Sequence, residues 1–379
     1  MTLPTTRPRT SSDAAIVMAE IGGGGMGKMR IHLVNELAAR GYRVDLVLGK
    51  PASAYSIPLH DAVRVHPIGT SHPVFGVPRL ALYLRSNRPH VILTQRHRVN
   101  VLAWRARRVA DVPAGLFATS ETHESNALET LTEGKRAKRL RQIRRYLARN
   151  DGLIAISRGV AEDLAMLTGR SRESIDIVPN PVVQSDVDER AAESVDHSWF
   201  QDTKIPVIVS AGRLSEAKNF PLLLQAFARL RARTRARLVI FGDGPMRPQL
   251  RQLADELGIA SEMDMPGFVD NLYAYFARSS LFVLSSRLEG LSNVLIEAMA
   301  VGTPVVSTDC PSGPAEVLEH GRLGTLIPLD DVDALAEAMQ SSLAAPIDPE
   351  LLRTIARERY SVEHSATAYI RALGFDRTR

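Results

Sequence analysis

Two glutamates, Glu289 and Glu297, stand eight positions apart around an expected turn from a strand to a helix. The apolar run at 281–284 predicts the strand, the run at 294–299 predicts a buried helix, and Ser292 is placed to cap it. A helix N-terminus presents backbone N–H groups and the positive end of the helix dipole, which together bind a phosphate. Carboxylates near that site can accept hydrogen bonds from sugar hydroxyls. A nucleotide-sugar carries both kinds of group and fits this turn.

The spacing of the two carboxylates separates their roles. Eight helical residues span roughly 12 Å, whereas the carboxylates of a glycoside hydrolase lie about 5–9.5 Å apart. We therefore expect Glu297 to accept hydrogen bonds from two ribose hydroxyls and Glu289 to contact the sugar. The alternative is a carboxylate at a helix start that is favoured by the dipole alone.

A second loop offers cations for a diphosphate. Arg213 and Lys218 follow the predicted strand at 207–211, in the same half of the chain as the glutamates. A guanidinium can hold phosphate oxygens with two N–H groups, and an ammonium adds a point charge. A solvated loop without a ligand is the alternative.

A glycine-rich loop follows the first predicted strand and opens a helix. It matches a nucleotide P-loop except that Met29 stands where Ser or Thr would hold magnesium, and it matches a dinucleotide fingerprint with Asp45 near the expected distance. We favour a flexible loop whose amides approach a diphosphate or an acceptor; a tight turn without a ligand is the alternative. The candidate residues are Gly24, Gly25, Gly27 and Lys28.

A polar loop after the predicted strand at 115–119 contains His123, with Glu121 and Glu124 as competitors. Histidine titrates near neutral pH, so His123 could orient or deprotonate an acceptor hydroxyl. A surface loop without chemistry is the alternative. The D-x-D triplets at 186–188 and 331–333 are interpreted as solvated charge, and no Cys/His spacing fits zinc. We therefore expect no metal and no cofactor.

Basic residues are concentrated in the first 150 residues of a chain whose net charge is +5. Many of them crowd a predicted helix at 135–149, which could lie on an anionic membrane or be a solvated face. No nucleic-acid-binding signature accompanies it. The single cysteine, Cys310, excludes an internal disulfide, and we see no secretory signal and no apolar run of about 20 residues. We expect a cytoplasmic protein, with possible contact at the inner face of the membrane.

Strands and helices alternate in both halves of the chain, which predicts two α/β domains with parallel sheets and a cleft between them. We place an acceptor-binding Rossmann-like domain at 1–185, a linker at 186–204 and a donor-binding Rossmann-like domain at 205–360. A C-terminal helix at 361–379 is expected to pack back toward the first domain. Each candidate motif follows a strand, where ligands bind in open α/β sheets.

Taken as an ordered set, these motifs resemble glycosyltransferase family 4. The resemblance covers about 150 residues of the second half and rests on these landmarks: Asn180-Pro181, Gly212-Arg213-Leu214, Lys218, Phe241-Gly242-Asp243-Gly244-Pro245, Gly267-Phe268-Val269, Ser286 with Glu289-Gly290, Glu297-Ala298-Met299-Ala300, Gly302-Thr303-Pro304-Val305-Val306 and Gly324-Thr325-Leu326-Ile327-Pro328. The first half matches more loosely. The segment at 309–316 resembles members that build bacterial surface or lipid-linked saccharides.

The resemblance implies a GT-B fold, two Rossmann-like domains facing each other across a cleft, and retaining transfer from a UDP- or GDP-sugar to a saccharide or polyprenyl-linked acceptor, without a metal. Arg213 and Lys218 would hold the diphosphate and Glu297 the ribose. The base would lie near Gly244 and Val269. The remaining donor contacts would come from Glu289 and the amides of Leu291, Ser292 and Asn293.

The first half departs from the family pattern. Family members commonly carry an acidic residue in the first glycine loop, which this chain lacks. The loop after the strand at 115–119 resembles two groups of members. Glu121 matches members with a Ser-Glu motif, and His123, which we favour, matches members with a loop histidine. A nucleotide-sugar epimerase of the same architecture, a dehydrogenase binding NAD at the first loop, and a non-catalytic lipid-surface protein are the other possibilities.

Overall fold

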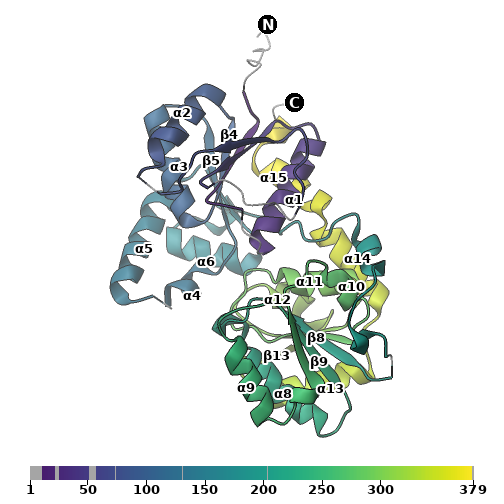
Figure 1. Ribbon diagram of the computed structural model, residues 1–379. Helices are drawn as coiled ribbons and strands as arrows, with labels where there is room; N and C mark the ends of the chain where they lie inside the picture. The colour runs from purple at the N-terminus through teal and green to yellow at the C-terminus, as the bar shows by residue number, and fades with distance from the viewer. Residues whose placement is uncertain are drawn as a thin grey trace. The chain divides into compact units, whose positions relative to one another are not determined.

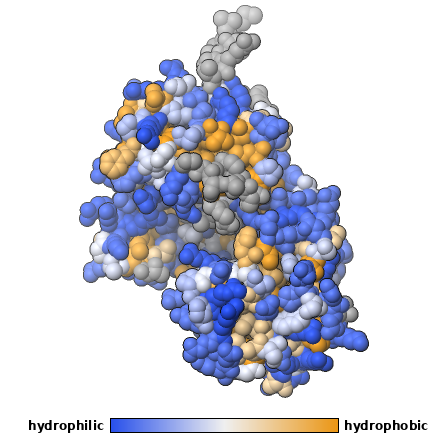
Figure 2. Space-filling model, viewed as in Figure 1, coloured by the Kyte–Doolittle hydropathy of each residue, from blue (hydrophilic) through white to orange (hydrophobic). Residues whose placement is uncertain are grey.

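The computed structural model describes residues 11–21, 25–50, 57–72, 74–129, 131–202 and 204–377. The chain divides into two compact units (Figure 1). The first unit comprises Met1–Pro181 and Val362–Arg379, and the second comprises Val182–Ser361. Hydrophilic residues cover most of both units in the view of Figure 2, because the apolar runs of the strands are buried.

The first unit is a parallel seven-stranded sheet in the order β3-β2-β1-β4-β5-β6-β7. Its strands are β1 Ala14–Met18, β2 Val44–Leu48, β3 Arg64–Pro67, β4 Val91–Gln95, β5 Gly115–Ser120, β6 Gly152–Ala155 and β7 Ile175–Ile177. The inner strands β1, β2 and β4 are buried along their whole length because helices cover both faces of the sheet. The strand order reverses between β1 and β4.

Helices cover each face of this sheet. Those of the first unit are α1 Gly25–Ala39, α2 Val77–Asn87, α3 His97–Ala110, α4 Glu124–Glu129, α5 Glu133–Tyr146, α6 Arg158–Thr168 and α15 Val362–Ala372, with short 3₁₀ turns η1 Leu147–Arg149, η2 Arg172–Ser174 and η7 Phe375–Arg377. Side chains of α1 and α15 share one core with the sheet, and those of α2 and α3 share the core on the other face. Helices α1 and α15 lie side by side although they come from opposite ends of the chain (Figure 1).

The second unit is a parallel six-stranded sheet in the order β10-β9-β8-β11-β12-β13. Its strands are β8 Val207–Ala211, β9 Arg237–Phe241, β10 Met263–Gly267, β11 Leu281–Leu284, β12 Val305–Thr308 and β13 Thr325–Ile327. Its helices are α7 Val187–Ala192, α8 Phe220–Arg231, α9 Arg247–Glu256, α10 Leu272–Phe276, α11 Asn293–Ala300, α12 Pro314–Val317, α13 Val332–Ala344 and α14 Pro349–Tyr360, with 3₁₀ turns η3 Ser198–Phe200, η4 Glu216–Lys218, η5 Ala260–Glu262 and η6 Glu319–Gly321. The order reverses between β8 and β11. The predicted fold class, two Rossmann-like parallel-sheet domains, is confirmed.

The boundaries between the units differ from the predicted ones. The segment at 186–204, expected to be a linker, lies within the second unit because its apolar side chains are buried there. Phe200 is 7% exposed and its ring centroid lies 5.3 Å from that of Tyr275. The last helix, α15, belongs to the first unit, where Arg40 donates a 2.7 Å hydrogen bond to the hydroxyl of Thr367.

Candidate functional site

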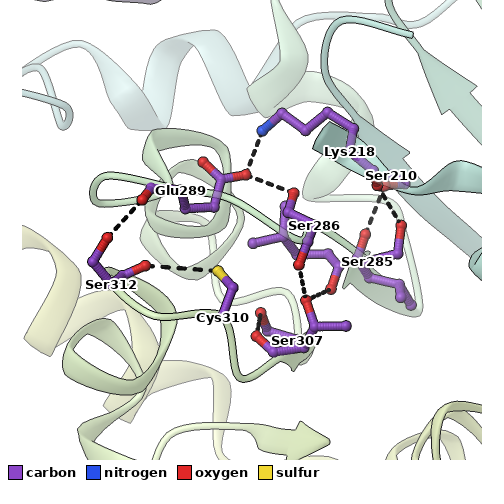
Figure 3. A network of polar contacts seen from close by, with 11 residues as sticks. Ser210, Lys218, Ser285, Ser286, Glu289, Ser307, Cys310 and Ser312 are labelled. Atoms are coloured by element: carbon purple, nitrogen blue, oxygen red, sulfur yellow. Dashed lines mark hydrogen bonds and ion pairs between the residues drawn. The ribbon is translucent and has the colours of Figure 1, made fainter. Parts of the chain in front are cut away.

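The side chains of Lys218 and Glu289 meet at the carboxyl end of the second sheet. Lys218 follows β8 and Glu289 follows β11, which are neighbours at the point where the strand order reverses. The Nζ atom of Lys218 lies 2.5 Å from Oε1 of Glu289, and the two side chains are 20% and 11% exposed (Figure 3). Ligands of open α/β sheets bind at this kind of strand end. The structure therefore brings together two residues that the sequence proposed separately.

Serine hydroxyls hold this ion pair in place (Figure 3). Ser286 donates a 2.6 Å hydrogen bond to the same Oε1 atom of Glu289 that contacts Lys218. Ser312 donates to the backbone carbonyl of Glu289 at 2.6 Å, and Ser285 donates to the backbone carbonyl of Lys218 at 2.8 Å. Both the carboxylate and its backbone are therefore positioned by the protein itself. Sequence reasoning missed Ser285 and Ser312, since a serine in a loop carries no signal of its partner.

A thiol lies beneath the pair. Cys310 is buried, and its Sγ atom is 3.6 Å from the backbone carbonyl of Ser312 (Figure 3). Burial, and next the negative charge of Glu289, raise the pKa of the Cys310 thiol to about 12. The thiol is therefore protonated at neutral pH and is not a nucleophile.

The N-terminus of α11 differs from the predicted one. Ser292 precedes the helix in a left-handed backbone conformation (φ 70°, ψ 67°), and its hydroxyl does not cap the helix. Residues that cap a helix usually have extended backbone angles, which aim the side chain at the first amides. The Ser292 Oγ atom is buried and has no hydrogen-bond partner in the described part of the chain. The predicted cap is therefore wrong, and the first turn of α11 lacks the side-chain oxygen that would have occupied it.

Glu297 lies one turn inside α11, half-buried, and its surroundings differ from those of Glu289. Its charge acts on the hydroxyl of Tyr273 on α10. Burial, and next the charge of Glu297, raise the pKa of the Tyr273 hydroxyl well above its usual value. The hydroxyl of Tyr273 donates to the backbone carbonyl of Val182 at 3.1 Å. The two carboxylates thus have different surroundings, and their separate roles toward a donor stay a prediction.

The other expected donor contacts follow neighbouring strands of the same sheet. Arg213 follows β8 and is exposed, and its side chain makes no ion pair with the described residues. Gly244 follows β9, and a Cβ atom there would lie 2.3 Å from the carbonyl oxygen of Leu214, so this turn requires glycine. Val269 follows β10 and is half-buried. Leu291 is buried and Asn293 half-buried at the start of α11. The carboxyl ends of β10, β9, β8 and β11 therefore carry the candidates in sheet order.

In the first unit, Glu121 is the counterion of a buried arginine. It lies 3.2 Å from the guanidinium of Arg30 on α1, and the side chains are 5% and 3% exposed. Gln95 at the end of β4 also donates to Glu121, and the hydroxyl of Tyr369 on α15 lies 3.5 Å from Arg30. Burial raises the pKa of the Glu121 carboxyl, and Arg30 opposes that effect. This pairing holds α1 and α15 against the sheet and distinguishes Glu121 from a freely accessible base.

His123 has a different environment. Its side chain is 18% exposed, and Nδ1 lies 3.6 Å from a carboxylate oxygen of Asp163 on α6. Ser125 donates its backbone N–H to the same Asp163 at 3.1 Å, while Glu124 is paired with Arg139 at 3.0 Å. At this distance Asp163 is a charged neighbour and not a hydrogen-bond acceptor, because Nδ1 of His123 has no hydrogen-bond partner in the described part of the chain. Asp163 was not identified from the sequence because it lies on a helix that is distant in the chain.

The glycine-rich loop is described only in part. Gly24 lies outside the described residues, whereas Gly25, Gly27 and Lys28 form the first turns of α1. They are helical rather than part of a flexible loop, and the first turn carries no acidic side chain. Lys28 is half-buried. The positive end of α1 is therefore not neutralised by a carboxylate of its own first turn.

The basic helix at 135–149 comprises α5 and η1. Its apolar side chains Ile143, Tyr146 and Leu147 are buried within the first unit rather than presented to solvent. The outer face carries a hollow of about 750 Å³ lined by Ala137, Leu140, Arg141, Arg144, Arg145 and Arg149. The helix is therefore a cationic surface, not the free amphipathic helix that could insert its apolar side into a membrane.

Two features are absent from the described ranges. No helix there is long and apolar enough to cross a bilayer. No group of three or more His, Cys, Asp or Glu side chains in those ranges is arranged to hold a metal ion.

Comparison with known families assigns both halves of the chain. Residues 24–181 match the glycosyl transferase 4-like domain, and residues 205–345 match the glycosyl transferases group 1. The Campylobacter jejuni N-acetylgalactosamine-N,N'-diacetylbacillosaminyl-diphospho-undecaprenol 4-alpha-N-acetylgalactosaminyltransferase is 33% identical over 193 residues, which is 51% of each chain. The match thus spans about half the length of that relative. The lipopolysaccharide core biosynthesis glycosyltransferase LpsE of Rhizobium meliloti is 29% identical over 92% of this chain and 96% of its own.

Solved structures share the fold. The Anabaena protein HepE, crystallised with UDP and glucose, superposes with a TM-score of 0.77 over 96% of this chain and 100% of its own, at 18% identity. The lipopolysaccharide outer core galactosyltransferase WaaB superposes with a TM-score of 0.70 over 96% of this chain and 99% of its own, at 19% identity. With both domains matched, and with the strand-end residues arranged as described, the chain belongs to the glycosyltransferases of family 4 type, which have the GT-B fold.

Proposed function

We propose that this glycosyltransferase moves a sugar from a UDP- or GDP-sugar to a saccharide or lipid-linked acceptor, with retention of anomeric configuration. The observation that carries the proposal is the Lys218–Glu289 pair, held at 2.5 Å by serine hydroxyls beside the uncapped first turn of α11. A cation, a carboxylate and a helix N-terminus together suit a diphosphate that is attached to a sugar. HepE, which shares the fold, was crystallised with UDP and glucose.

Each donor group has a proposed partner in the second unit. Arg213, which is exposed and unpaired in the described structure, and Lys218 hold the diphosphate. Glu297 accepts the ribose hydroxyls, and Glu289 contacts the donor sugar. The amides of Leu291, Ser292 and Asn293 hold the phosphate next to the sugar, and the base lies near Gly244 and Val269.

The proposed chemistry follows from these charges. The bond between the sugar and the diphosphate breaks, and negative charge develops on the departing nucleotide. Arg213, Lys218 and the start of α11 stabilise that charge, as preorganised positive groups do in many enzymes. This cationic set takes the place of a metal ion in the proposal. The acceptor hydroxyl attacks from the face that the nucleotide leaves, and its proton passes to an oxygen of the departing diphosphate. His123, with Asp163 beside its Nδ1 atom, positions that hydroxyl.

The names of the relatives support the class of acceptor. LpsE is named for lipopolysaccharide core biosynthesis, and the Campylobacter jejuni enzyme is named for a glycan on diphospho-undecaprenol. We infer that this chain acts in the biosynthesis of a bacterial polysaccharide or lipid-linked glycan at the cytoplasmic face of the membrane. The arginine-lined face of α5 would contact anionic head groups there by electrostatic attraction alone, at about 1 kcal/mol per basic residue.

A donor screen with product analysis tests the proposal. The purified chain is incubated with UDP- and GDP-sugars and acceptor extracts, nucleotide release is measured, and the anomeric configuration of the product is read by NMR. We expect release and retained configuration, which Glu297→Gln abolishes and Arg251→Ala, on the exposed side of α9, preserves. Conversion of the UDP-sugar without an acceptor would indicate an epimerase. Vesicle binding without nucleotide affinity would indicate a non-catalytic surface protein.

A further inference from the structure

Three strand ends meet at the point where the order of the first sheet reverses. β1 and β4 are neighbours there, and β5 lies beside β4. Glu20 follows β1, and Glu121 follows β5. Gln95 is the last residue of β4, and Arg96 comes directly after it. In open α/β sheets the crevice outside such strand ends is the ligand site. These residues therefore line the place where the first unit would hold its own ligand.

Arg96 has an unusual backbone conformation. Its φ of 68° and ψ of 139° lie in a region that residues with a Cβ atom rarely adopt. Its neighbours hold it there: Gln95 is buried and bonded to Glu121, and His97 is buried with Nε2 2.9 Å from the side-chain oxygen of Gln142. The side chain of Arg96 is nevertheless exposed. Strain of this kind is concentrated at functional sites.

Among the described residues at these strand ends, each carboxylate forms its ion pair with a cation other than Arg96. Lys50 lies 3.0 Å from Glu20, and Arg30 lies 3.2 Å from Glu121, so each carboxylate already has its own cation. The positive charge of Arg96 acts only weakly on the carboxyls of Glu20 and Glu121, after those of Lys50 and Arg30 respectively. Its guanidinium makes no hydrogen bond or ion pair with any residue in the described ranges. The excess charge of this cluster is therefore positive and is carried by Arg96.

A second polar atom at this place also lacks a partner. Glu121 is 5% exposed, and its Oε1 atom binds Gln95 and Arg30. Its Oε2 atom is buried and accepts no hydrogen bond within the described structure. A carboxylate oxygen is an acceptor for a hydroxyl group, and a free guanidinium binds oxyanions with two N–H groups. A sugar phosphate carries both a hydroxyl and an oxyanion.

We propose that Arg96 binds the phosphate of a phosphate-bearing acceptor, so that the first unit selects acceptors whose sugar is linked to phosphate or diphosphate. Gln95, which donates to Glu121, holds the end of β4 that precedes Arg96, and the unpaired oxygen of Glu121 accepts a hydroxyl of the same sugar. The inference rests on the proposed transfer function, because it assigns the acceptor of that reaction. It adds a specificity-determining residue to the first unit.

The test uses two phosphate probes on the full chain with UDP present in excess, so that the donor half is occupied. Binding of glucose 1-phosphate and of geranyl diphosphate is followed by ³¹P NMR for wild type, Arg96→Gln and Arg98→Gln. Arg98 lies two residues after Arg96, in the first turn of α3. It is exposed and lies within the regular helix, so it serves as a matched charge control. We expect Arg96→Gln to weaken binding by at least about tenfold, the loss typical of a charged hydrogen bond. Arg98→Gln should stay within about twofold of wild type.

The two probes distinguish the sources of phosphate. Tighter binding of glucose 1-phosphate supports a phosphate carried by a saccharide, and tighter binding of geranyl diphosphate supports a lipid-linked diphosphate. Three results would overturn the assignment of Arg96: no binding of either probe to wild type, equal affinity for wild type and Arg96→Gln, or an equal loss in Arg98→Gln. A separate titration with UDP alone examines the donor site. Absence of UDP binding would count against the proposed function, whereas absence of phosphate-probe binding with UDP bound would count against Arg96 alone.

The melting temperature distinguishes a role of Arg96 in ligand binding from a role in stabilising the fold. Arg96→Gly removes the Cβ atom that disfavours φ of 68°, so its melting temperature should equal or exceed that of wild type while phosphate binding is lost. A melting temperature clearly below that of wild type would show that the arginine side chain supports the fold, which would contradict a role in ligand binding.

Discussion

Replacing Glu289 by glutamine should change nucleotide binding and sugar transfer in opposite directions. In the absence of a donor, Lys218 is engaged with Glu289 at 2.5 Å. If Lys218 holds the diphosphate, that contact must weaken or be shared when UDP binds. Glutamine keeps the shape of the side chain and the hydrogen bond from Ser286, which lies 2.6 Å from the same oxygen, but it removes the charge that competes for Lys218.

The size of each effect follows from the geometry. A hydrogen bond between charged groups contributes about 1.5–3 kcal/mol, and both side chains are mostly buried, at 20% and 11% exposure. Recovering roughly half of that energy would tighten UDP binding about tenfold. Transfer should fall by about 10²–10³, the loss seen when one preorganised polar group at a reacting centre is removed. The reason is that a neutral amide cannot balance the positive charge that develops on the sugar.

Calorimetry with UDP and initial rates with the preferred UDP-sugar measure the two effects. Glu262→Gln, which removes the carboxylate of a surface pair with Arg231 in the same unit, is the matched control and should change neither. Weaker UDP binding by Glu289→Gln would refute the competition for Lys218. An unchanged transfer rate would refute the contact between Glu289 and the donor sugar.

Three further predictions concern the units themselves. Burial, and next Arg139, lower the pKa of His97 to about 4, so the folded first unit favours the neutral ring. The unfolded chain binds the proton at higher pH. The free energy of unfolding of the first unit should therefore fall by about 3 kcal/mol as the pH is lowered from 6.5 to 4. Urea titrations followed by tryptophan fluorescence in a Trp199→Phe background, where Trp104 of the first unit is the probe, should show this loss, and His97→Gln should remove it. Labelling of Cys310, with its pKa raised to about 12, should be roughly a thousandfold slower at pH 8 than for a free thiol until the second unit unfolds; labelling at the ordinary rate in the native state would contradict its burial. Gly242→Ala should destabilise the second unit by more than about 2 kcal/mol, because the new Cβ would lie 2.0 Å from a backbone oxygen at φ of 117°. Gly258→Ala, with open space at φ of 67°, should cost only about 1 kcal/mol in the same unfolding assay.

The buried strands could be predicted from the sequence because their apolar runs are continuous. The ranges 207–211 and 281–284 coincide with β8 and β11, which lie in the middle of the second sheet. The edge strand β3 was not predicted, because its exposed and polar residues give no such run. The interpretation of 186–204 as a linker also failed, since the acidic composition of this segment hides the few apolar side chains that anchor it, such as Phe200.

The site could be predicted as a set of residues but not as a set of contacts. Lys218 and Glu289 were both candidates, yet their direct pairing depends on two strands, distant in the chain, being neighbours in the sheet. The same holds for His123 and Asp163 and for Glu121 and Arg30, whose burial changes the expected role of the glutamate. The left-handed backbone of Ser292, which prevents the predicted cap, is likewise set by the surrounding fold rather than by the local sequence.

The central claim is that the strand ends of the second unit form the binding site for a nucleoside diphosphate. Its most direct test is a calorimetric titration of UDP into wild type, Lys218→Ala and Arg251→Ala. We predict one UDP bound per chain of wild type and of Arg251→Ala, with affinity at least tenfold lower for Lys218→Ala, which loses a charged hydrogen bond. Equal affinity of wild type and Lys218→Ala, or no heat of binding with UDP or GDP in any of the three proteins, would contradict the claim.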